Sequence, residues 1–236
     1  MPEHTVKAYS EELEALSSEV ARMGGIAESA FSDSLAAVVR RDTRLAREVV
    51  ARDEKIDEAQ REIEHRAIRL MALRHPYAND LRQVLSAWRI GIDLERVGDL
   101  AKNIAKRTKV INEFDPIDLT QSIESMGKFA SIQLKAVLDA YSSRDAKAAV
   151  GVWSHDEDID RHYNALFREL LTYMMEDPRT IGPCAHLLFV AKNIERIGDH
   201  CTNIAEQVHY LVTGEELIRD RPKRGDVAAA PPAGEP

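Results

Sequence analysis

Asp53-Glu54-Lys55-Ile56-Asp57 is the stretch that decides the fold, because it returns 103 residues later as Asp156-Glu157-Asp158-Ile159-Asp160. A second stretch, Glu95-Arg96-Val97-Gly98-Asp99, returns with an offset of 100 as Glu195-Arg196-Ile197-Gly198-Asp199. A repeat of about 100 residues is longer than a solenoid unit, so the sequence indicates a duplicated domain. Both copies keep their acidic residues, which argues against random surface decoration.

The composition is typical of a globular protein built from long helices. The chain has 236 residues, of which 44% are hydrophobic and 31% charged, with only 11 Gly and 9 Pro to interrupt helices. The net charge of -8 argues against a nucleic-acid partner, since phosphate contacts need clustered Lys and Arg. No apolar run approaches the roughly 20 residues of a membrane span, so we expect no direct membrane insertion. Cys184 and Cys201 have no zinc spacing, which favours a reduced cytoplasmic setting.

The spacing of apolar residues predicts three helices in the first half. An apolar stripe in steps of three and four runs from Val6 to Val38. Two further lines of apolar residues recur every seven positions, on either side of a break at His75-Pro76. These lines are Val49, Ile56, Ile63 and Leu70, then Ile90, Val97, Ile104 and Ile111. Asp115-Pro116 ends the half.

The second half repeats this plan. We predict helices from about Leu119 to Tyr141 and from about Asp145 to Met175, a break at Glu176-Asp177-Pro178, and a last helix that carries Val190, Ile197, Ile204 and Leu211. The predicted fold is therefore all-α, with six helices arranged as two tandem three-helix bundles. The expected domains are residues 1–115 and 116–218, followed by a disordered tail, residues 219–236, that is rich in Ala and Pro.

The acidic residues should meet across each helical hairpin. In an antiparallel hairpin, residues equally far from the turn lie level, and Asp57 with Glu95, like Asp53 with Asp99, are equally far from Pro76. The corresponding pairs of the second half are equally far from the junction of Asp177 and Pro178. Each half thus predicts a quartet of level carboxylates. The quartets are Asp53, Asp57, Glu95 and Asp99, then Asp156, Asp160, Glu195 and Asp199.

Four neighbouring carboxylates repel one another unless a cation compensates, and oxygen-rich sites suit hard ions such as magnesium, manganese and iron. The alternative is a solvated acidic face, because Glu95 and Asp99 lie about 160 degrees from Val97 on the helical wheel. A single acidic pair would favour the solvated face, whereas two quartets in matching register favour metal. The same wheel predicts that the metal lies near the surface, in a shallow groove.

Other candidate sites are weaker. Glu62-x-x-His65 and Glu206-x-x-His209 have the glutamate-histidine spacing of di-iron sites but do not correspond under the repeat, so we interpret them as surface residues. We expect His162, His186 and His200 to be hydrogen-bonded or solvated, and Cys201 to be a buried thiol rather than a nucleophile. No catalytic residue is predicted. Gly98 and Gly198, in mid-helix, indicate either a close approach of another helix or a tolerated exposed glycine.

Residues 94–105 and 193–206 resemble the paired signatures of the PhoU family, and Asp80-Leu81-Arg82 and Met174–Arg179 are also similar to that family. The resemblance covers about residues 6 to 214. It implies a cytoplasmic homodimer, not an enzyme, that represses the phosphate-starvation response when phosphate is ample. It further implies a link between the ATP-binding subunit of the phosphate ABC transporter and a membrane sensor histidine kinase. The family's E(D)xxxD metal motif maps onto the eight acids of the two quartets, with iron, manganese, magnesium or zinc as the metal ion.

The second hypothesis is a carboxylate-bridged metalloprotein of helix-bundle class, for metal storage or oxidation. Oxygen-activating sites usually add histidine ligands in the core. No histidine recurs in both halves of this sequence, and this favours the adaptor over the oxidase.

Overall fold

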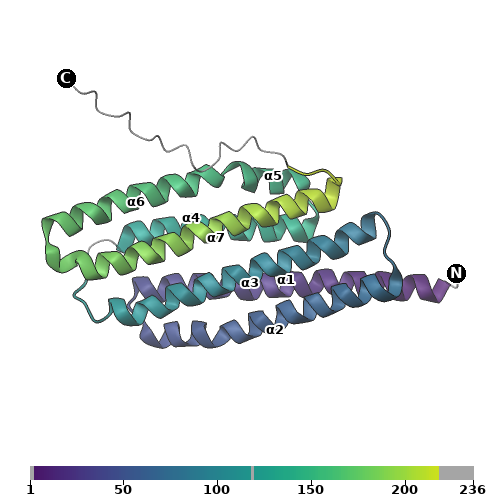
Figure 1. Cartoon of the computed structure of the whole chain (residues 1–236), viewed down its shortest axis with the longest axis horizontal. Coiled ribbons are helices and arrows are strands. Elements are labelled where there is room, and N and C mark those ends of the chain that lie inside the picture. Colours follow the sequence, from purple (N-terminus) through teal and green to yellow (C-terminus); the bar gives the residue numbers. More distant parts are fainter. Residues whose placement is uncertain (1–2, 118–119, 218–236) are drawn as a thin grey trace, which may run out of the picture.

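The computed structural model describes residues 3–117 and 120–217, and within these ranges every regular element is helical (Figure 1). The first repeat comprises α1 (Glu3–Val39), α2 (Thr43–Arg74) and α3 (Asn79–Ile111). The second comprises α4 (Thr120–Ser143), α5 (Ala146–Ser154), α6 (Asp156–Glu176), the short 3-10 helix η1 (Pro178–Thr180) and α7 (Ile181–Thr213). The prediction of an all-α fold with two three-helix repeats is confirmed. The expected tail, residues 219–236, lies outside the described residues.

The lines of apolar residues that predicted the helices form the core. All four members of the line on α2 and all four on α3 are buried, and on α7 only Leu211 is partly buried. Each such side chain contributes roughly 1.5 to 3 kcal/mol through its burial. The core therefore fixes which face of each helix turns inward, and so where the acidic residues come to lie.

The helix boundaries repeat as faithfully as the core. Asp42 caps α2 by accepting hydrogen bonds from the backbone N–H groups of Arg44 and Leu45, at 2.9 and 3.0 Å. Asp145, 103 residues later, caps α5 in the same way, with both N···O distances 2.9 Å. Such caps satisfy backbone donors that the first helical turn leaves unpaired.

The helix expected from about Asp145 to Met175 is wrong in one respect, since it is divided at His155 into α5 and α6. The His155 ring Nδ1 lies 2.6 Å from the carbonyl oxygen of Gly151, the group that an unbroken helix would offer to the His155 backbone. That backbone N–H instead donates to Val152 O at 3.1 Å. The buried Gln133 side chain donates to the His155 carbonyl at 3.1 Å. A side chain thus competes for the helix bond and interrupts it.

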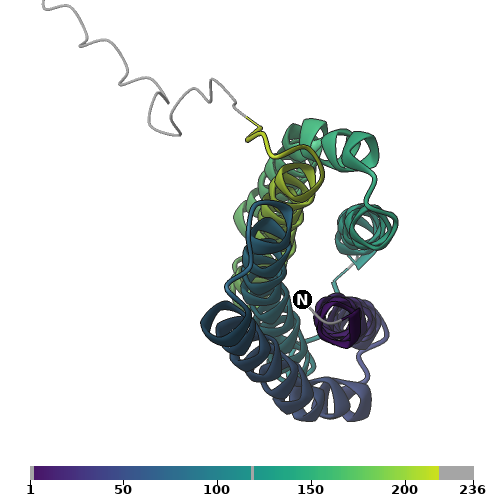
Figure 2. The same ribbon diagram turned by 90° about the vertical axis from the view of Figure 1, so that its right-hand side faces the viewer.

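The helices form two layers. Viewed end-on, α2, α3, α7 and the α5–α6 pair make a curved layer, with α1 and α4 against one face (Figure 2). The two repeats therefore meet through α3 with α7 and through α1 with α4. Within the described parts of the chain, none of the helices combines the length and apolarity needed to cross a bilayer.

The contacts between the repeats are reciprocal. A Cβ atom added to Gly24 would lie 2.5 Å from Leu138 Cδ2, and one added to Gly127 would lie 2.6 Å from Leu35 Cδ1. The offset of 103 residues turns one contact into the other. On α3 and α7, Arg89 Nη1 donates to Gln207 Oε1 at 3.4 Å, and the corresponding positions are also in contact. There the Arg107 guanidinium lies 4.4 Å from the ring centroid of Phe189. The repeats are thus related by an approximate two-fold axis.

Candidate metal centre

A close approach of two helices lies at the centre of each acidic hairpin. Gly98 lies between Glu95 and Asp99 in the sequence, and a Cβ atom added to it would lie 2.7 Å from Ile56 Cδ1. A Cβ atom added to Gly198 would lie at the same 2.7 Å from Ile159 Cδ1. Of the two interpretations of these glycines, the close approach is therefore correct. Because Ile56 lies between Asp53 and Asp57, its contact with Gly98 draws the two acidic pairs together.

The electrostatics of the first quartet follow from this approach. Desolvation raises the pKa of Glu95, and the charges of Asp99, Asp57 and Asp53 raise it further, against the opposing effect of Arg96. Desolvation likewise raises the pKa of Asp57, with Asp53 the next largest cause. Each of these acids thus senses partners on both helices of the hairpin. The structure brings Asp53, Asp57, Glu95 and Asp99 near one another across the hairpin of α2 and α3.

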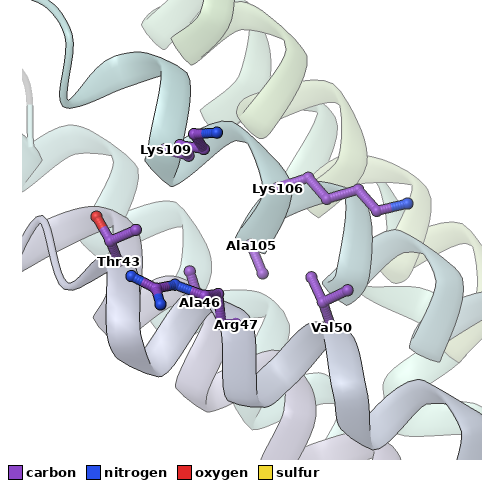
Figure 3. A pocket seen from close by; sticks show the side chains of 7 residues that line it. All are labelled: Thr43, Ala46, Arg47, Val50, Ala105, Lys106 and Lys109. Carbon is purple, nitrogen blue, oxygen red and sulfur yellow. The ribbon is translucent and has the colours of Figure 1, made fainter.

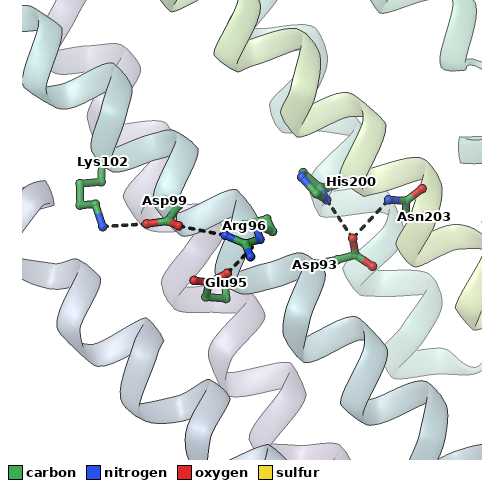
Figure 4. A network of polar contacts seen from close by, with 7 residues as sticks. All are labelled: Asp93, Glu95, Arg96, Asp99, Lys102, His200 and Asn203. Atoms are coloured by element: carbon green, nitrogen blue, oxygen red, sulfur yellow. Dashed lines mark hydrogen bonds and ion pairs between the residues drawn. The ribbon is translucent and has the colours of Figure 1, made fainter. Parts of the chain in front are cut away.

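Two cationic side chains lie among these carboxylates (Figure 4). Lys102 Nζ is 2.5 Å from Asp53 Oδ2 and 2.7 Å from Asp99 Oδ1. Desolvation lowers the pKa of Lys102, but these hydrogen bonds outweigh it, so the pKa is raised and the amine stays charged. Arg96 lies 3.4 Å from Glu95 and 3.5 Å from Asp99. Sequence reasoning missed both cations, although the three-residue spacing of each from Asp99 could have indicated them.

The donor set of the first quartet fits a hard cation, although its present spacing does not enclose one. Among the described residues, no three His, Cys, Asp or Glu side chains are arranged to hold a metal ion. Lys102 Nζ lies between Asp53 and Asp99 and supplies the positive charge there. Asp53 Oδ1 is buried and accepts no hydrogen bond in the described structure, and Asp57 has no ion-pair partner there. Such uncompensated oxygens are suited to bind a divalent ion.

The second quartet differs in its surroundings. Glu195 is only 1% exposed, and Lys192 Nζ lies 2.6 Å from its Oε2 atom. Asp160 and Asp199 are half-buried, while the side chain of Asp156, at the start of α6, lies outside the described residues. Lys192 stands at a position that holds Ile92 in the first repeat, so the two quartets have different counter-charges.

The two quartets are more deeply buried than the helical wheel predicted. Asp53 is 8% exposed and Glu195 1%, whereas a solvated acidic face would leave both in water. The reason is the glycine contact, which brings α2 against α3 and α6 against α7 more closely than an average pair of side chains would allow.

The weaker candidates have ordinary structural partners. Glu62 pairs with Arg66 at 2.6 Å, and Glu206 accepts a hydrogen bond from Trp153 Nε1 at 3.0 Å, so both glutamates of the Glu-x-x-His pairs are engaged elsewhere. His200 Nδ1 lies 2.8 Å from Asp93 Oδ1, to which Asn203 also donates, and these contacts join the two repeats (Figure 4).

The expectation of a buried thiol at Cys201 is confirmed, and burial raises its pKa. The low-pKa thiolate that a nucleophile needs is therefore disfavoured at this position.

Known proteins share both the sequence and the arrangement of this chain. The model of the PhoU domain matches residues 20–108 and again residues 123–208. The phosphate-specific transport system accessory protein PhoU homolog of Caulobacter vibrioides is 61% identical over 224 residues, covering 94% of this chain and 97% of that protein. The crystal structure of PhoU from Pseudomonas aeruginosa superposes with a TM-score of 0.85 at 37% identity, covering 88% of this chain and 100% of that chain. The phosphate transport system regulatory protein PhoU from Streptococcus pneumoniae gives a TM-score of 0.83 at 31% identity, covering 89% and 100%. A duplicated three-helix unit with these matches over both halves establishes that the chain belongs to the PhoU family.

Proposed function

We propose that this protein is a metal-binding adaptor that represses the phosphate-starvation response by linking a phosphate ABC transporter to a sensor histidine kinase. Membership of the PhoU family makes it an accessory, regulatory protein of phosphate transport, in a family that is not enzymatic. The proposal of metal binding rests on the first quartet. There, four carboxylates lie close together and Lys102 and Arg96 form ion pairs with three of them.

The residues proposed to hold the metal ions are the eight acids of the quartets. In the first repeat, Asp53, Asp57, Glu95 and Asp99 would offer oxygen ligands to magnesium, manganese, iron or zinc. A bound cation would favour their ionised forms and allow Lys102 to turn towards solvent. Burial is the largest cause of the raised pKa values of Glu95 and Asp57, and the neighbouring carboxylates add to it. A bound cation would offset this repulsion, which supports the proposal. Metal binding to the folded state alone would stabilise the fold.

The adaptor role rests on membership of the PhoU family, whose relatives are accessory proteins of phosphate transport. The proposed setting is the cytoplasm, where a homodimer would contact the ATP-binding subunit of the transporter on one side and the kinase on the other. The metal-storage or oxidase hypothesis gains no support from the described histidines, since His186 and His200 contact Arg107 and Asp93 rather than the quartets.

The test is a phosphate-starvation reporter in cells that lack this protein. We expect the reporter to stay on at high phosphate in the deletion strain and to be switched off when the intact chain is restored. A chain with four substitutions, Glu95→Gln, Asp99→Asn, Glu195→Gln and Asp199→Asn, should restore repression poorly. It has lost half of the carboxylates of each quartet, and with them the negative charge that attracts the metal ion.

The matched control changes two acids outside the quartets, Glu11→Gln with Glu14→Gln, which are exposed on α1. This control should repress like the intact chain, at equal protein levels. Normal repression at high phosphate in the deletion strain would refute the regulatory role. Full repression by the quartet variant would refute the role of metal while leaving the regulatory role standing.

A further inference from the structure

We propose that the groove between the start of α2 and the end of α3 binds an organic phosphate of about nucleotide size. The groove has a volume of about 430 Å³, within the range of small-molecule sites. Figure 3 shows its two walls, with side chains from α2 on one and from α3 on the other. The lining residues are Thr43, Ala46, Arg47, Val50, Ala105, Lys106 and Lys109.

The cations of this groove have no counter-charges among the residues that the structure describes. Arg47, Lys106 and Lys109 are exposed, and within the described residues none of them makes an ion pair or a side-chain hydrogen bond. This is unusual for a chain of net charge -8, in which acidic residues outnumber basic ones. Three cations facing one groove create a local positive potential that favours an anion. An arginine also offers paired N–H donors that match a phosphate group.

The remaining lining residues indicate what kind of anion fits. Thr43 Oγ1 accepts a hydrogen bond from Asn112 Nδ2 at 3.0 Å, which leaves its hydroxyl proton available to donate. The floor between the cations is apolar and formed by Ala46, Val50 and Ala105. A bare phosphate ion would fill only a small part of the groove and would leave this floor in water. A phosphate attached to a flat organic group would contact the cations and the floor together.

The second repeat carries the same position in a closed form. The offsets of 103 and 100 residues place Trp153 where the first repeat has Val50, and Glu206 where it has Lys106. Trp153 Nε1 donates to Glu206 Oε1 at 3.0 Å, so an indole ring and a carboxylate join the two walls. The position of Arg47 is occupied by Val150 in the second repeat, which therefore lacks this cation as well. The open, cationic groove is therefore a feature of the first repeat. In the second repeat the corresponding space is bridged by Trp153 and Glu206.

The second repeat provides a pair of side chains, Trp153 and Glu206, that this helical arrangement already accommodates. Val50→Trp combined with Lys106→Glu would give the first repeat the pair that the second repeat contains. The experiment is calorimetric titration of the full chain with ATP as the probe, in EDTA and without added metal, so that metal bound to the acidic quartets plays no part. We expect one ATP per chain for the parent and a loss of about tenfold or more in affinity for this variant, the loss expected for one charge-assisted hydrogen bond.

Two further variants separate the groove from general charge. Arg47→Gln with Lys109→Gln keeps the groove open, and should also weaken ATP by about tenfold or more. Lys147→Glu changes an exposed lysine at the start of α5 and should leave ATP affinity unchanged. Far-ultraviolet circular dichroism should report the same helix content for all four proteins. Binding of ATP should weaken as salt is raised.

The outcomes that would overturn the proposal are distinct. Absence of saturable ATP binding, or equal affinity of the parent and the Val50→Trp, Lys106→Glu variant, would refute it. Inorganic phosphate should bind at least about tenfold more weakly than ATP because it cannot use the apolar floor, and equal affinity would refute an organic ligand. A glutamate-rich peptide that bound the groove more tightly than ATP would show that the surface docks an acidic protein segment instead.

Discussion

Gly98 and Ile56 set the distance between the acidic residues of the first repeat, and their side chains carry none of the charge. Glu95 and Asp99 flank the glycine, while Asp53 and Asp57 flank the isoleucine, so the four acids surround an apolar contact. The level placement of these acids could be predicted from the sequence, because residues equally far from the turn of an antiparallel hairpin lie level and Pro76 marks that turn. The spacing of Lys102 from Asp99 indicates one of its two ion pairs, but the other, with Asp53 on α2, could not be predicted. A flexible lysine can reach several carboxylates, and tertiary packing decides between them.

Gly98→Ala should lower the stability of the protein although alanine is the better helix former. Its methyl group would meet Ile56, a stiff β-branched side chain, and such overpacking costs about 1 to 3 kcal/mol, against a gain of about 1 kcal/mol in helix propensity. Gly25→Ala is the matched control, because a Cβ atom there would contact nothing within 4 Å. It should raise stability by about 0.5 to 1 kcal/mol. Urea unfolding measures both, and equal gains in both variants would contradict the prediction.

The raised pKa of Glu95 predicts a particular dependence of stability on pH. A carboxyl group that holds its proton more tightly when folded makes the folded state lose stability as pH rises from its unfolded pKa, about 4.3, through its raised folded pKa. Glu95→Gln should remove part of this loss and make the metal-free protein more stable above that window. Urea unfolding in EDTA from pH 4 to pH 8 tests this, with Glu14→Gln as the control. A steeper loss in the Glu95→Gln variant would oppose the prediction.

Among the elements, the helices could be predicted from the apolar spacing and from the breaks at His75-Pro76 and Asp177-Pro178, because both signals are local. The division between α5 and α6 could not, since it depends on where the His155 ring and the distant Gln133 side chain place their hydrogen bonds. Neither histidine nor glutamine is a residue type that usually ends a helix. Side-chain competition for backbone groups is thus the part of the fold that periodicity does not reveal.

The packing of α1 against α4 should depend on the fit of Leu138 to Gly24. Gly24→Ala would place a methyl group 2.5 Å from Leu138 Cδ2 and should cost about 1 to 3 kcal/mol. Adding Leu138→Ala should relieve the clash, so the double variant should be more stable than the sum of the two single effects, by roughly 0.5 to 3 kcal/mol. Urea unfolding of the four proteins gives this coupling. Gly151→Ala, which contacts nothing within 4 Å, should be additive with Leu138→Ala.

For the whole molecule, the approximate two-fold relation places the two quartets on different hairpins, α2 with α3 and α6 with α7. Manganese or iron should therefore bind to the two sites independently. Metal should raise the melting temperature of the parent, by the equivalent of about 2.7 kcal/mol per site at a free concentration one hundred times the dissociation constant. Glu95→Gln with Asp99→Asn should abolish only one of the sites.

Elemental analysis and thermal unfolding with and without metal would measure both effects. The complementary variant, Glu195→Gln with Asp199→Asn, is the internal control and should retain the first site. A melting temperature that metal leaves unchanged, together with no bound metal in the parent, would mean that the quartets are held by Lys102, Arg96 and Lys192 alone.

The reciprocal contacts of Gly24 with Leu138 and of Leu35 with Gly127 have a consequence for the origin of the chain. In an isologous subunit interface, residue i of one copy meets residue j of the other and the converse also holds, as it does between these repeats. The interface is that of a symmetric pair of three-helix subunits joined end to end by a peptide link. The covalent link makes the association of the two units intramolecular, at an effective concentration of about millimolar. The two units therefore stay together even when the protein is dilute. Within one chain the two copies can differ in sequence, so one half has a groove lined by Val50 while Trp153 of the other half donates a hydrogen bond to Glu206.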